Sequence, residues 1–157
     1  MAGNTRILTT GGDGMVGSQV DFGIRLGRSQ LDILKPKSIE VAIKKYNPQV
    51  ILHLAAMTNM LSCEQNPEEA YKTNVTGTRN IAIACRKNNI RLVYASTCAV
   101  FPGNKKDPYD ENDKVGAVNV YGSSKLMGER VAKKILPDVL IIRTGWLFGG
   151  EKMTGNL

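Results

Sequence analysis

The stretch Thr10-Gly11-Gly12-Asp13-Gly14-Met15-Val16-Gly17 decides the fold of this chain. Residues 6–10, just before the glycines, contain Ile7 and Leu8 beside two threonines and predict a short buried strand. Gly11, Gly14 and Gly17 then follow at intervals of three, which lets the backbone turn tightly and approach a pyrophosphate at the start of a helix. A merely flexible turn is the alternative, but the preceding strand favours a nucleotide-binding turn.

Further along the chain, strand-like and helix-like segments alternate. Residues 50–56, 91–96 and 139–143 are apolar runs without period-two alternation, as is typical of strands covered on both faces. Helical spacing predicts helices over 36–46, 66–88 and 119–135. This alternation predicts right-handed crossovers and an α/β fold, a three-layer, doubly wound parallel sheet of the Rossmann type.

The stretch from Gly17 to Asp32 is unusually short. A crossover helix usually needs a dozen residues by itself, and this stretch must also hold a second strand. We therefore expect a truncated first helix near residues 15–22 and a very short second strand near 24–26.

Composition narrows the class of protein. The 157 residues are 42% apolar, which suits one globular domain over 1–157, and their apolar runs fall far short of the roughly 20 residues of a membrane span. The start of the chain shows no export signal, and three scattered cysteines predict neither a disulfide framework nor a metal site. The net charge of +7 comes from dispersed basic residues. We expect a cytoplasmic protein that binds neither nucleic acid nor membrane.

Tyr121 and Lys125 lie four residues apart and so share one face of the predicted third helix. A nearby ammonium lowers the pKa of a phenol, which makes proton transfer by tyrosine feasible; an exposed surface pair is the alternative. Gly128 and Ala132 keep the same face small, which leaves space for a ligand. At the end of a predicted central strand, the Thr97 hydroxyl could bond a substrate carbonyl or simply cap a turn. Within the apolar strand 50–56, His53 is expected to be structural rather than catalytic.

An acid about 20 residues after the first glycine often holds the cofactor ribose, and Asp32 has that offset from Gly11. Asp32 could instead cap the next helix or meet the adenine amino group. Arg25 and Arg28 lie near the end of the predicted second strand, where a guanidinium could pair with the 2′-phosphate of NADP or remain an ordinary surface arginine.

Together with Leu54-Ala55-Ala56, Asn74-Val75-Thr76-Gly77-Thr78 and Ser96-Thr97, the glycine turn and the Tyr121–Lys125 motif make the chain resemble extended short-chain dehydrogenases/reductases. Within that superfamily, Cys63-Glu64, Val100-Phe101, Pro108-Tyr109-Asp110-Glu111 and Arg143-Thr144-Gly145-Trp146-Leu147-Phe148-Gly149 look most like dTDP-4-dehydrorhamnose reductases.

The resemblance implies a chemistry and a set of site residues. Tyr121 would donate a proton to the ketone of a dTDP-4-keto-6-deoxysugar while NADP or NAD in its reduced form supplies hydride. Lys125 would hold the nicotinamide ribose, Thr97 would polarise the carbonyl, and Asn74 would support the site. The product would be a dTDP-6-deoxysugar such as dTDP-rhamnose, and a homodimer is left open. The expected cofactor-binding residues are Gly11, Gly14, Met15, Val16, Gly17, Arg28, Asp32, Ile33, Ala55, Ala56, Met57, Tyr121 and Lys125.

Two departures from the family pattern stand out. Cys98 replaces the acid that usually follows the catalytic threonine, and the family continues past this point with a smaller substrate domain, so we expect that domain to be largely absent and the isolated chain to have low activity. A sugar-nucleotide epimerase or dehydratase shares the same motifs. A nucleotide-binding regulatory subunit, like that of methionine adenosyltransferase, is the alternative without catalysis.

Overall fold

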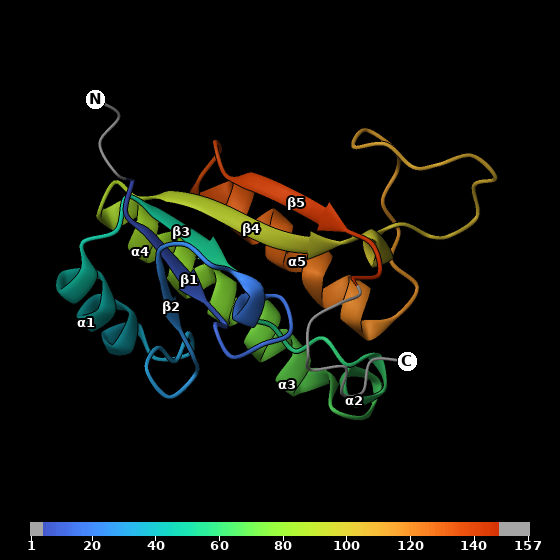
Figure 1. The fold of residues 1–157 in the computed structure, drawn as a ribbon. Helices are drawn as coiled ribbons and strands as arrows, with labels where there is room; N and C mark the ends of the chain where they lie inside the picture. The colour runs from blue at the N-terminus through green and yellow to red at the C-terminus, as the bar shows by residue number, and fades with distance from the viewer. Residues whose placement is uncertain (1–4, 148–157) are drawn as a thin grey trace.

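A computed structural model describes residues 5–147, and its centre is a five-stranded parallel sheet in the order β2-β1-β3-β4-β5 (Figure 1). The strands are β1 (Ile7–Thr10), β2 (Ile24–Leu26), β3 (Val50–His53), β4 (Arg91–Thr97) and β5 (Leu140–Thr144). Each neighbouring pair is parallel. The Rossmann-like α/β fold is therefore confirmed. Phe148 and Gly149 of the motif quoted above lie outside the described residues.

Two of the predicted helices are confirmed as α1 (Pro36–Tyr46) and α5 (Val120–Ile135). The predicted helix over 66–88 is instead α3 (Pro67–Tyr71), a π-helical turn (Lys72–Gly77) and α4 (Thr78–Lys87). A further short helix, α2 (Met60–Gln65), was not predicted. Figure 1 shows α1, α4 and α5 side by side on one face of the sheet, with α4 between the other two.

The core lies between those helices and the sheet. Leu8 and Ile51 of the strands and Ile39 and Ile81 of the helices have no exposed surface. Each such side chain contributes roughly 1.5–3 kcal/mol when it leaves water. This burial holds β1 and β3 together and so fixes the two strand ends that border the candidate site.

The first crossover differs from the prediction. The truncated helix expected near 15–22 is wrong, because the chain forms only one 3-10 turn, Gly17–Gln19, before β2. The short strand β2 is confirmed at residues 24–26. The stretch is too short for a helix and a reversal, and the chain reverses at Gly23, whose φ of 67° favours glycine.

Over the described residues, one face of the sheet is thinly covered. In place of a helical third layer, the described residues on that face form the loop that follows β1 (Figure 1). Leu140 and Ile142 pair in register with Val93 and Ala95, and they stay 56% and 43% exposed.

Within residues 5–147, none of the helices combines the length and the apolar character that a membrane crossing requires.

Candidate active site at the carboxyl edge of the sheet

The glycine turn leaves β1 next to β3, where the order of the strands reverses. Doubly wound sheets bind their ligands in the crevice at this position. A Cβ on Gly11 would lie 2.7 Å from the Ala55 nitrogen, and Gly11 has a φ of 70°. Only glycine therefore allows the turn after β1 to lie against the segment after β3.

The rest of the turn is open to a ligand on one side. The Gly14 nitrogen donates to the Gly11 carbonyl at 3.0 Å, and Met15 and Val16 are both more than a third exposed. A Cβ on Gly17 would collide with the Gly11 oxygen. The Asp13 carboxylate lies against Gly27, just after β2, so it points away from the glycine side of the turn.

Asn74 links the segment after β3 to α5. Its side chain is fully buried in the π-helical turn, where Oδ1 accepts from the Met57 nitrogen at 2.8 Å. Nδ2 donates to the Met57 carbonyl and to Ser124 Oγ, both at 2.9 Å. Ser124 Oγ in turn donates to the Tyr121 carbonyl. Asn74 thus positions other site residues, with every hydrogen atom of its amide in use.

His53 lies between the glycine turn and α4. Its Nδ1 is 2.7 Å from Thr10 Oγ1 and its Nε2 is 3.2 Å from Thr78 Oγ1. Because Thr78 donates to the Asn74 carbonyl, it can only accept from His53 Nε2–H. Burial, together with the nearby charge of Lys125, lowers the pKa of His53 to about 3. The structural role predicted for His53 agrees with these contacts.

Thr97 and Tyr121 meet where β4 ends and α5 begins. The Thr97 Oγ1 accepts from the Ala99 nitrogen at 3.1 Å, so it does cap a turn, and its own proton is directed to Tyr121. The side chain of Asn119 caps α5 through the Gly122 nitrogen and fixes the turn that carries Tyr121. Burial raises the pKa of Tyr121, and a hydrogen bond with Thr97 offsets part of that increase.

Lys125 is only 3% exposed and is directed toward β4. Its Nζ donates to the Ala95 carbonyl at 2.7 Å and lies 4.2 Å from the centre of the Tyr94 ring. Burial lowers the pKa of Lys125 to about 7, although the charge of Glu129 acts in the opposite direction. The predicted lowering of the Tyr121 pKa by Lys125 is not observed, because burial dominates the titration of the phenol.

Other predicted residues lie further from this arrangement. Arg28 is exposed after β2, and the Ile33 side chain is buried against Gly77. Asp32 Oδ1 accepts from the Leu34 nitrogen at 3.0 Å, so this carboxylate stabilises the turn before α1. The space expected beside Gly128 is absent, because the Tyr94 hydroxyl and the Asn74 carbonyl fill it.

Sequence reasoning missed Ser124, Glu129 and Arg143. Glu129 is buried on α5 and accepts from Arg143 on β5. One signal was available, since Glu129 lies four residues after Lys125 and therefore shares its helix face.

The parallel sheet, with the glycine turn where its order reverses and with Thr97, Tyr121 and Lys125 towards the same edge, has the architecture of the short-chain dehydrogenase/reductase class. The model of the RmlD substrate binding domain family matches residues 5–156. The chain belongs to this family.

Its relatives carry consistent names. It is 37% identical over 153 residues to dTDP-4-dehydrorhamnose reductase of Streptomyces griseus. The matched region covers 92% of this chain and 50% of that protein. It is 34% identical to dTDP-4-keto-6-deoxy-D-glucose reductase of Streptomyces niveus, with 94% and 54% covered. The dTDP-4-dehydrorhamnose reductase of Bacillus anthracis, solved in complex with NADP, superimposes with a TM-score of 0.88 at 31% identity, covering 94% of this chain and 56% of that one. The chain thus spans about half the length of the relatives that it matches.

Proposed function

We propose that this chain is the dinucleotide-binding and catalytic part of a reductase that uses NADPH or NADH to reduce a dTDP-4-keto-6-deoxysugar, as in the formation of dTDP-rhamnose. The observation that carries the proposal is the contact of Thr97 with Tyr121 at the carboxyl end of β4, with Lys125 one helical turn further along α5 and bonded to Ala95 of the same strand. The names of the relatives supply the substrate class.

The residues present fit a dinucleotide. The close approach of Gly11 to Ala55 leaves backbone rather than side chains at the crevice, as a pyrophosphate requires. We assign Gly11, Gly14, Met15, Val16 and Gly17 to the phosphates. Ala55, Ala56 and Met57 would line the far wall of the crevice. When bound, the reduced nicotinamide would supply hydride.

Tyr121 can act as the proton donor, because its phenol is protonated at neutral pH. Burial raises its pKa and so makes it a weaker acid, and a charged Lys125 would counteract this effect. The Thr97 hydroxyl would bond the ketone oxygen. Burial lowers the pKa of Lys125, and the bound cofactor would have to raise it for the ammonium to be fully charged beside the ribose hydroxyls.

The first test is a titration with NADPH and with NADH, followed by nicotinamide fluorescence. The Gly14→Asp variant places a carboxylate in the turn, with its Cβ in tight contact with the Gly11 carbonyl at 3.2 Å. The matched control is Gly116→Asp, whose Cβ would lie 3.8 Å from Pro102. We expect saturable binding that Gly14→Asp abolishes and Gly116→Asp preserves; no binding of either cofactor would refute the proposal.

The Tyr121→Phe variant tests the assigned proton donor. Loss of a positioned acid lowers turnover of the dTDP-4-keto-6-deoxysugar by about 100-fold or more. Cofactor affinity should change little, since the Tyr121 backbone keeps its bond to Ser124. Turnover at the rate of the unaltered protein would remove Tyr121 from this role.

The cofactor preference and the assembly are further parts of the proposal. Exposed Arg28 suits the 2′-phosphate of NADP, while Asp32, held at its turn, would contact only the adenosine end together with the backbone of Ile33. We further infer that residues 1–157 act as one dinucleotide-binding domain in the cytoplasm, without nucleic acid, and that a homodimer is compatible with the exposed sheet face.

An epimerase or a regulatory subunit would also bind the dinucleotide. Net oxidation of NADPH by a dTDP-4-keto-6-deoxysugar separates a reductase from both.

A further inference from the structure

The Glu129 carboxylate accepts three hydrogen bonds next to the candidate active site. Its Oε1 accepts from Ser96 Oγ at 2.5 Å and from Arg143 Nε at 2.9 Å, and its Oε2 accepts from Arg143 Nη2 at 2.8 Å. The two bonds from Arg143 form the paired, planar geometry in which a guanidinium binds a carboxylate most strongly. Glu129 is 4% exposed, so little water competes with these bonds. They fix Ser96, the neighbour of Thr97.

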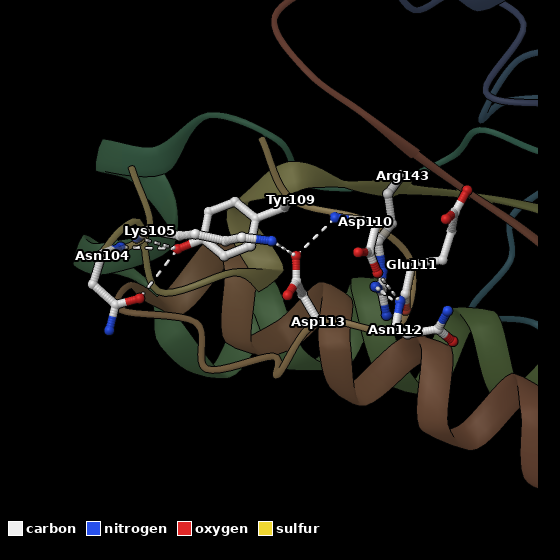
Figure 2. Close-up of polar contacts among 8 residues, drawn as sticks. All are labelled: Asn104, Lys105, Tyr109, Asp110, Glu111, Asn112, Asp113 and Arg143. Atoms are coloured by element: carbon white, nitrogen blue, oxygen red, sulfur yellow. Dashed lines mark hydrogen bonds and ion pairs between the residues drawn. The ribbon is translucent and has the colours of Figure 1, made fainter. Parts of the chain in front are cut away.

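Arg143 also reaches the segment 101–119, which joins the end of β4 to the start of α5. Its guanidinium carbon lies 5.0 Å from the centre of the Phe101 ring, and Nη1 lies 3.5 Å from the Glu111 carbonyl oxygen. The Phe101 ring stacks on Tyr109 at 4.4 Å. Figure 2 shows Arg143 directed toward Asp110, Glu111 and Asn112.

Apart from the bond that the Gly116 nitrogen donates to the Val100 carbonyl at 2.9 Å, the remaining contacts of the segment are largely internal. Lys105 Nζ lies 2.6 Å from Asp113 Oδ2, and Tyr109 Oη accepts from the Asn104 and Lys105 nitrogens (Figure 2). Such contacts keep the shape of the segment but do not attach it to the sheet. Arg143 provides an attachment, because β5 pairs directly with β4 at Ser96 and Thr97.

We propose that Arg143 is a positioning residue of the site: through Glu129 it fixes the strand end that carries Thr97, and through Phe101 and Glu111 it holds the segment 101–119 at the carboxyl edge of the sheet. The segment begins just after Thr97 and ends just before Tyr121, so its placement shapes the entrance to both. The part of this inference that concerns Thr97 chemistry rests on the proposed function. The attachment itself does not.

Hydrogen exchange measured by mass spectrometry on the whole chain tests the attachment. Arg143→Gln removes the charge, Arg143→Lys keeps the charge without the planar fork, and Phe101→Leu removes only the stacked ring. Lys105→Gln is the matched control, since it loses an ion pair internal to the segment. We expect hydrogen exchange in 101–119 to rise at least about fivefold in Arg143→Gln and by less in Arg143→Lys. In these two variants and in Phe101→Leu, the increase should be confined to that segment.

A second readout reports on the strand end itself. Cys98 is exposed next to Thr97, whereas Cys63 and Cys85 are buried. The rate at which a disulfide reagent labels Cys98 should rise in Arg143→Gln and in Glu129→Gln, but not in Lys105→Gln. A variant that failed to fold would be replaced by Arg143→Lys or Phe101→Leu in both assays.

The outcomes separate this inference from the proposed function. Unchanged exchange in 101–119 with unchanged Cys98 labelling would overturn it, and so would an equal increase in exchange throughout the chain. Neither assay contains a cofactor. A chain that binds no dinucleotide but shows local loosening would therefore refute the proposed function alone.

Discussion

His53 makes the stability of the chain depend on pH. Burial lowers its folded-state pKa to about 3, whereas the unfolded chain has the ordinary value of 6.5. Below pH 6.5 the unfolded state binds a proton at His53 that the folded state does not bind. The free energy of unfolding therefore decreases as the pH falls toward 3. The free energy of unfolding should drop by up to about 1.4 kcal/mol per pH unit in that window.

Urea unfolding at a series of pH values measures this slope. His53→Gln should be less stable at pH 7 but should show a shallower fall on acidification, because its side chain does not titrate. Parallel curves for the two proteins would show that carboxylates alone cause the acid sensitivity.

At the scale of single residues, the sequence indicated candidate residues but not their contacts. Tyr121 and Lys125 were selected because residues four apart on a helix share a face, and Thr97 because it ends a predicted strand; their chemical roles stay predictions. The bonds of Glu129 to Ser96 and Arg143 join positions 33 and 14 residues apart. Such pairs depend on strand register and helix rotation, which local patterns do not specify.

Among the elements, α5 packs unusually close to its neighbours at Gly128. A Cβ there would lie 2.5 Å from the Tyr94 hydroxyl and 2.8 Å from the Asn74 carbonyl. Gly128→Ala should therefore destabilise the chain by about 1–3 kcal/mol, despite the better helix propensity of alanine. Gly116→Ala, with its nearest contact at 3.8 Å, is the control. Thermal unfolding with equal midpoints for both variants would contradict this packing.

The boundaries of most elements could be predicted, and the exceptions have physical causes. The strand at 24–26 could be predicted because the short stretch from Gly17 to Asp32 leaves room for only a few strand residues. The helix near 15–22 was wrong, since the chain must reverse at Gly23 before a second helical turn can form. The π-helical turn at Lys72–Gly77 was missed because it is stabilised by the tertiary bonds of Asn74.

For the molecule as a whole, the exposed sheet face should dominate behaviour in solution. Parallel sheets are normally covered on both faces, yet Leu140 and Ile142 are about half exposed here. We expect the chain to bind the dye ANS while folded and to associate as its concentration rises. Replacing both residues with threonine, a good strand former, should reduce dye fluorescence and light scattering. Unchanged light scattering in that double variant would show that the chains associate through another surface.

The buried Lys125 has a consequence for the heat of binding. With a pKa of about 7, it carries about half a positive charge at neutral pH. A dinucleotide that completes this charge would draw about half a proton from the buffer for each molecule bound. Calorimetry in phosphate and in Tris, which release protons with very different enthalpies, should then give two different heats for one and the same affinity.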